Sequence, residues 1–108
     1  MLTIIACRLG EEPKVEQMKP GIDAMQAFVG GYVEAVRLEG AYGCAGVDLY
    51  CDEEFLLKGR APNRWVSREL LIHGDFFISA HDDEGETVSL TPAQVETYLA
   101  RARAWPVG

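Results

Sequence analysis

The amino-acid sequence predicts one small α+β domain, in which an antiparallel sheet of four or five strands packs against two or three helices. Three observations favour this fold class. Several short segments alternate apolar and polar residues, as half-buried strands do. Two other segments repeat apolar residues at helical spacing. The length of 108 residues, with 48% hydrophobic and 25% charged residues, suits a single domain over residues 1–108.

The first part of the chain predicts a strand, a polar connection and a helix. Leu2 to Cys7 is short, apolar and β-branched, which favours a buried strand. Glu11 to Pro20 is polar and predicts a connection without regular structure. A helix should follow because apolar residues recur three and four positions apart, at Ile22, Met25, Phe28 and Val29. Gly30 should end this helix, since glycine accepts the left-handed conformation of a C-cap.

A long-looped hairpin is predicted next. Residues 32–38 alternate in polarity and place Glu34 among apolar side chains on one strand face. The glycine-rich stretch 40–46 should be the loop, and Val47 to Cys51 alternates again as the second strand.

The middle of the chain predicts a turn, a short strand and a short helix. The acidic run 52–54 should turn the chain before Phe55 to Leu57, which we expect to add a strand. Asn63 is a suitable N-cap for a helix that would carry Arg64 and Arg68 on one side.

The last part predicts a hairpin and the helix with the strongest local signals. Residues 76–81 and 87–90 are predicted strands on either side of an acidic turn with Gly85. Thr91 and Gln94 form a capping-box pattern with Pro92 between them, so a helix should begin there and pack on the sheet. We expect nine apolar side chains to line the core: Leu2, Ile4, Met25, Phe28, Val36, Leu49, Ile78, Val95 and Leu99.

Charge and cysteine content narrow the functional classes. Seventeen acidic against ten basic residues give a net charge of -7, which disfavours direct binding to nucleic acid or to anionic lipid. The apolar run Leu2 to Cys7 lacks a basic leader and is too short to span a bilayer. We therefore expect a cytoplasmic protein without a membrane segment. An odd number of cysteines without a C-x-x-C pair predicts thiols rather than disulfides, at Cys7, Cys44 and Cys51.

Several short segments carry a family resemblance. They are F-V-G-G-Y-V-E at 28–34, D-E-E at 52–54, L-K-G at 57–59, P-N at 62–63 and G-D at 74–75. In these segments, over about residues 22–80, the chain resembles the domain of unknown function 3846 family, which occurs largely in phages, plasmids and bacterial genomes. It departs from the family pattern at Asp52, where Asn is usual, and at Phe55, where Gly is usual. The resemblance implies a small α+β accessory domain of mobile-element origin and supplies no catalytic residues.

Two groups of residues are candidates for binding a ligand. Glu34, a carboxylate on an apolar strand face, could act as an acid or base; an edge strand is the alternative explanation. Arg64 and Arg68, beside the free amides of a helix that begins at Asn63, could hold a phosphate or carboxylate. Exposed arginines that pair with nearby carboxylates would give the same pattern.

A partner surface is predicted at the first acidic turn, with Asp52, Glu53 and Glu54, and at Trp105 near the end of the chain. Together with the second acidic turn, these carboxylates could imitate a phosphate backbone and occupy a DNA-binding protein. That decoy would require both turns on one face. Solvated turns are the simpler explanation.

Catalysis and cofactor binding have no motif in the sequence. His73 and His81 are the two imidazoles, and neither belongs to a zinc-binding spacing, so we expect no metal and no cofactor. We expect a non-enzymatic binding module for a protein partner or a small anionic ligand, able to form a homodimer through exposed strand edges. The alternatives are the acidic decoy and a small enzyme that uses Glu34 with His73 or His81.

Overall fold

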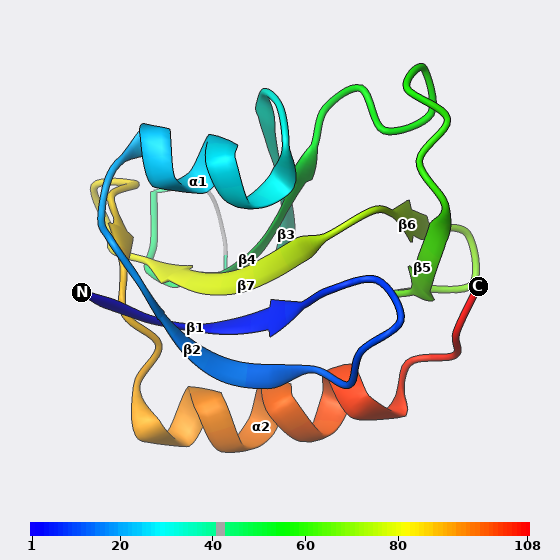
Figure 1. Ribbon diagram of the computed structural model, residues 1–108. Coiled ribbons are helices and arrows are strands. Elements are labelled where there is room, and N and C mark those ends of the chain that lie inside the picture. Colours follow the sequence, from blue (N-terminus) through cyan, green and yellow to red (C-terminus); the bar gives the residue numbers. More distant parts are fainter. Residues whose placement is uncertain (41–42) are drawn as a thin grey trace.

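A six-stranded antiparallel sheet forms the centre of the structure, a computed structural model that describes residues 1–40 and 43–108. One helix covers each face of the sheet (Figure 1). The strands are β1 (Leu2–Cys7), β2 (Lys14–Met18), β3 (Val33–Glu39), β4 (Gly46–Asp52), β5 (Pro62–Trp65), β6 (Leu71–His73), β7 (Phe76–His81) and β8 (Thr87–Val88). The helices are α1 (Ile22–Val29) and α2 (Pro92–Ala104).

The strand order is β2-β1-β7-β4-β3, and the short β8 also pairs with β7. β7 joins two hairpins, because it pairs with β1 of the first and with β4 of the second. Helix α1 carries the chain from β2 at one edge to β3 at the other (Figure 1). β5 and β6 form a separate two-stranded sheet.

Each face of the sheet has its own apolar core, because successive side chains of a strand point to opposite faces. Under α1, Met25 and Val29 pack with Ile4, Tyr50 and Phe77. The larger core includes Tyr98 and Ala102 of α2 and is completed by buried residues of β1, β4, β6 and β7 and by Leu90. Of the nine predicted core residues, Ile4, Met25, Leu49 and Ile78 are buried, and Leu2, Phe28, Val36, Val95 and Leu99 pack half-buried around them.

Helix α2 begins and helix α1 ends where the local sequence predicts. The Thr91 hydroxyl accepts a hydrogen bond from the Gln94 amide, and the Gln94 side chain accepts one from the Thr91 amide, which is the predicted capping box. Gly30 caps α1 with φ of 84°, a conformation that favours glycine. Two helices lie within the predicted number, and α2 packs on the sheet as predicted.

Four predictions about local structure are wrong. The main sheet has six strands rather than four or five. The polar segment 11–20 contains β2, which pairs with β1 at the sheet edge and therefore needs few apolar residues. Residues 55–57 form a turn instead of a strand, and the helix predicted to begin at Asn63 is strand β5. The hairpins β3–β4 and β7–β8 are confirmed, although residues 41–42 of the predicted loop 40–46 lie outside the described residues.

The last residues of the chain fasten β5. The Trp65 amide donates a hydrogen bond to the Pro106 carbonyl, and the Gly108 amide donates one to the Asn63 carbonyl. Residues beyond α2 therefore lie alongside β5 like a third strand. In the described part of the chain, neither helix has the length and apolar composition needed to cross a membrane.

Candidate functional site

Strand β4 carries two buried aspartates, Asp48 and Asp52, near its two ends. Both side chains point to the face that α1 covers, because they lie an even number of residues apart. Each aspartate organises a cluster of polar contacts with segments that are distant in the sequence.

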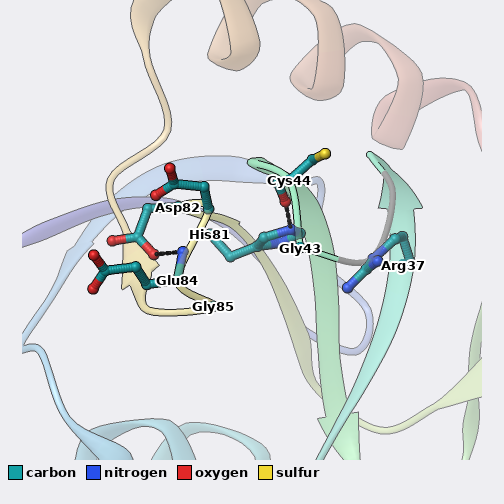
Figure 2. A pocket seen from close by; sticks show the side chains of 8 residues that line it. Arg37, Gly43, Cys44, His81, Asp82, Glu84 and Gly85 are labelled. Carbon is teal, nitrogen blue, oxygen red and sulfur yellow. Dashed lines mark hydrogen bonds between the residues drawn. The ribbon is translucent and has the colours of Figure 1, made fainter.

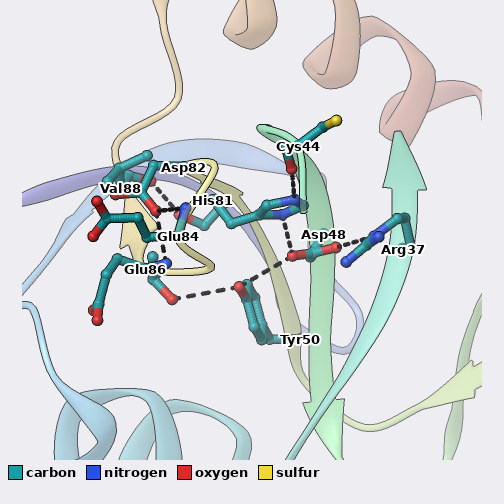
Figure 3. A network of polar contacts seen from close by, with 11 residues as sticks. Arg37, Cys44, Asp48, Tyr50, His81, Asp82, Glu84, Glu86 and Val88 are labelled. Atoms are coloured by element: carbon teal, nitrogen blue, oxygen red, sulfur yellow. Dashed lines mark hydrogen bonds and ion pairs between the residues drawn. The ribbon is translucent and has the colours of Figure 1, made fainter. Parts of the chain in front are cut away.

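The first cluster joins β3, β4 and β7. Asp48 Oδ2 lies 2.5 Å from His81 Nδ1, and Asp48 Oδ1 lies 3.6 Å from Arg37 Nε. Nε2 of His81 lies 3.0 Å from the Cys44 carbonyl, and the Tyr50 hydroxyl donates to Asp48 at 3.4 Å. Figure 3 shows these side chains in one continuous network.

A small pocket of about 240 Å³ opens beside His81. Figure 2 shows Arg37 and Cys44 on one side of it and the acidic turn after β7 on the other. His81 itself is only 5% exposed. Both of its ring nitrogens face acceptor atoms, so Nε2 donates to Cys44 and has no lone pair to offer a substrate or a metal ion.

The second cluster surrounds Asp52, whose side chain has no exposed surface. Its carboxylate accepts hydrogen bonds from Lys58 Nζ at 2.9 Å, Arg60 Nε at 2.8 Å and the Glu54 amide at 2.9 Å. The same two cations also donate to the Gly30 carbonyl at the end of α1, at 3.2 and 2.9 Å. Asp52 therefore fastens the turn that follows β4 to the C-terminus of α1, where positive charge is favourable.

Opposing effects set the pKa of Asp52. Burial alone would raise the pKa, because it disfavours the charged carboxylate. The hydrogen bonds from the Glu54 amide, Lys58 and Arg60 outweigh burial and lower the pKa below its ordinary value. Asp52 is therefore held in its ionised form.

The close approach of three segments explains Gly31. A Cβ atom at this position would collide with Lys58 Nζ and would lie 2.8 Å from Asp52 Oδ1. A side chain at residue 31 would therefore displace the Asp52 cluster. The segments that carry the family resemblance at 28–34, 52–54 and 57–59 meet at this cluster.

The Asp52 cluster presents a turn with exposed leucines. Leu56 is 70% and Leu57 is 85% exposed, and both belong to the turn 53–59. The turn lies at the upper right of Figure 1. We call these two side chains the apolar tip. Tyr32, also largely exposed, lies beside the start of the turn because its carbonyl accepts a hydrogen bond of 2.8 Å from the Glu53 amide.

A second apolar feature lies near the end of the chain. A pocket of about 390 Å³, here named the tryptophan groove, is lined by Trp65, Val66, Ser67, Arg68, Trp105 and Pro106. Trp65 is 38% exposed. Trp105, predicted to lie on a partner surface, is half-buried against Phe76 and contributes its remaining surface to this groove.

The predicted anion site does not assemble. Asn63 is buried, and its amide donates to the carbonyls of Cys7 and Gly74 rather than capping a helix. The Arg64 guanidinium donates to the carbonyls of Trp105 and Glu11. Arg68 is exposed and lines a different pocket from Arg64.

The remaining predicted residues lie apart from one another. Glu34 is exposed on edge strand β3, as the alternative explanation holds. The surface position predicted for Asp52 is wrong, because its carboxylate is buried, whereas Glu53 is exposed and Glu54 is half-buried. His73 stacks on a phenylalanine and its Nδ1 lies 2.8 Å from the Arg60 carbonyl.

The two alternative functions meet geometric obstacles. Glu34 pairs with Cys51 and shares the α2 face, whereas His81 pairs with Gly46 and shares the α1 face, so these two side chains lie on opposite sides of the sheet. The two acidic turns leave opposite ends of the sheet, roughly 20 Å apart along β4. Within residues 1–40 and 43–108, no group of three or more His, Cys, Asp or Glu side chains is placed to hold a metal ion.

Sequence reasoning missed both aspartate clusters and the apolar tip. A signal for the first cluster was that Asp48 and His81 occupy polar positions of two strands in the sheet. The partners of Asp52 could have been suspected from Lys58 and Arg60, which follow it six and eight residues later.

Comparison with known proteins identifies the family. No curated protein and no solved structure matches the chain. The family model described as domain of unknown function DUF3846 matches residues 2–103, which extends well beyond the segments that carry the resemblance in the sequence. The chain therefore belongs to the DUF3846 family.

Proposed function

We propose that the chain is a non-enzymatic protein-binding module, and that the apolar tip is its binding surface. The observation that carries this proposal is the exposure of Leu56 and Leu57, at 70% and 85%, on a turn that ion pairs to the buried Asp52 hold in place. Adjacent exposed leucines with a neighbouring exposed tyrosine form the type of apolar surface that marks interaction sites.

The physical gain from binding at the tip is substantial. Transfer of a leucine side chain from water into an apolar pocket contributes about 1.5–3 kcal/mol. The ion pairs from Lys58 and Arg60 to Asp52 order the turn before binding, which reduces the entropy lost in the complex. Glu53 and Glu54 stand at the edge of this surface, so a partner should offer an apolar pocket with positive charge beside it.

The proposal favours a protein partner over a small anionic ligand. The Arg64 guanidinium donates to two backbone carbonyls and Arg68 lies in another pocket, so these two arginines do not converge on an anion. An enzyme based on Glu34 and His81 would need side chains from opposite faces of the sheet.

Affinity capture tests the proposal. The wild-type chain and the variant Leu57→Lys are immobilised and exposed to lysate of the source cells, with Ile22→Lys as the matched control because Ile22 is an exposed apolar residue on α1. A protein retained by the wild type and by the control, but lost with Leu57→Lys, is purified and its dissociation constant is measured by calorimetry. We expect a loss of at least about tenfold in affinity for Leu57→Lys.

Equal affinity of the purified partner for the wild type and Leu57→Lys would refute the proposal. Thermal unfolding of all three proteins must first agree, which is expected because substitutions of exposed residues change stability by about 0.5 kcal/mol or less.

A further inference from the structure

The tryptophan groove is an apolar surface that the chain itself leaves open. Trp65, Val66, Trp105 and Pro106 form its apolar lining, and its volume of about 390 Å³ lies within the range of about 300–1,000 Å³ that suits bound groups. Arg68 is the one charged residue among those described that line it. Among the ion pairs of the described residues, none includes Arg68.

The apolar tip complements this groove in shape and in charge. The tip is a protruding turn with two adjacent leucines, whereas the groove is a hollow with aromatic walls. Glu53 and Glu54 precede the leucines, and neither takes part in an ion pair within residues 1–40 and 43–108. The tip therefore brings negative charge beside apolar surface, and the groove offers Arg68 beside apolar surface.

We propose that the apolar tip of one copy binds in the tryptophan groove of a second copy of this chain. This inference rests on the proposed function and names the partner. Leu57, the most exposed of the large hydrophobic side chains described, would enter the groove between Trp65 and Trp105. Arg68 would then meet a carboxylate at the base of the tip, which fixes the orientation of the contact.

The contact joins two different surfaces, so a twofold axis that relates two copies brings each tip to the other copy's groove. Two copies that exchange tips reciprocally make the contact twice and close a dimer. The net charge of -7 on each copy opposes association through long-range repulsion. The measurement is therefore made at about 0.15 M salt, where the screening length is about 8 Å.

Sedimentation velocity on purified chains tests this contact. Leu57→Lys places a charge on the tip and leaves the groove intact. Trp65→Ala removes one aromatic wall of the groove and leaves the tip intact. We expect the wild type to associate as its concentration rises to about 1 mM, and each variant alone to associate at least about tenfold more weakly. An equimolar mixture of the two variants should form a one-to-one dimer, because it contains one intact tip and one intact groove. Ile22→Lys should behave as the wild type.

A wild-type chain that stays monomeric at about 1 mM overturns the inference. So does a mixture that associates no better than its two components. Both results leave the proposed function intact if capture of another protein still depends on Leu57, so the two failures are distinguishable. If Trp65→Ala unfolds, the variants Arg68→Glu and Glu53→Lys replace it in the test. Arg68→Glu alone should associate more weakly than the wild type. A mixture of Arg68→Glu with Glu53→Lys should restore association, because the two charges at the contact are exchanged.

Discussion

Asp48 Oδ2 lies 2.5 Å from Nδ1 of His81, and the opposite ring nitrogen of His81 donates a hydrogen bond of 3.0 Å to the Cys44 carbonyl. These contacts join β4, β7 and Cys44 on the α1 face of the sheet.

Nitrogen NMR should detect this proton arrangement directly. We expect the Nε2–H of His81 to be protected from exchange with water, because it donates to a carbonyl in a site that is only 5% exposed. Replacement of His81 by Ala should destabilise the fold by about 1–3 kcal/mol, because Asp48 would lose its closest polar partner while remaining buried. An unprotonated Nε2 in the native protein would contradict this arrangement.

Asp52 should stabilise the fold in a pH-dependent manner. Its pKa is lower in the folded chain than in the unfolded chain, so its contribution is complete above the unfolded value of about 3.9 and is lost as the pH falls through the folded value. At pH 7, Asp52→Asn should lower the free energy of unfolding by about 3 kcal/mol. Urea denaturation at pH 7 and at pH 3 measures the difference between variant and wild type, which should shrink at the lower pH. A difference that is independent of pH would exclude the ionised state of Asp52 as its cause.

The three thiols should differ in reactivity. Burial raises the pKa of both Cys7 and Cys51 to about 12, and for Cys51 the charges of Glu34 and Asp52 act in the same direction. Cys44 is exposed. Iodoacetamide at neutral pH should therefore modify Cys44 alone in the native protein and all three cysteines in denaturant, as counted by mass spectrometry. Rapid modification of Cys7 in the native protein would contradict its burial.

The side-chain amide of Asn63 should stabilise the fold. Its Nδ2 donates to the carbonyls of Cys7 and Gly74, at 3.0 and 2.8 Å. Asn63→Ala should cost about 1–3 kcal/mol, because both carbonyls lose a donor. Asn63→Asp should cost more, since a carboxylate would face two acceptors. Thermal unfolding of both variants at pH 7 gives this order, and an equal cost for the two would show that the amide hydrogens are unimportant.

Local signals predicted the elements whose causes lie close together in the sequence. The capping box of α2 is complete within four residues, from Thr91 to Gln94. The β7–β8 hairpin likewise follows from two alternating segments around one turn. Asn63 shows the limit of such signals, because its type suits a helix N-cap although its amide serves Cys7, 56 residues earlier.

The candidate sites depend on strand pairing, which local patterns do not determine. Asp48 and His81 lie 33 residues apart and meet because β4 pairs with β7, although two strands separate them along the chain. β2 escaped prediction because only Val15 and Met18 are apolar among its five residues. An edge strand pairs on one side alone and leaves much of its surface in water, so its sequence resembles that of a loop.

The central position of β7 has a consequence for how the chain folds during synthesis. The hairpins β1–β2 and β3–β4 are complete once Asp52 has been made, but the strand that pairs with both of them is β7, at residues 76–81. Isolated two-stranded hairpins are marginally stable in water. At about 5–20 residues per second, the ribosome holds the two halves apart for roughly a second or more before β7 joins them. The nascent chain therefore acquires its stability late, and until β7 has joined the two hairpins their apolar residues are open to chaperones and proteases.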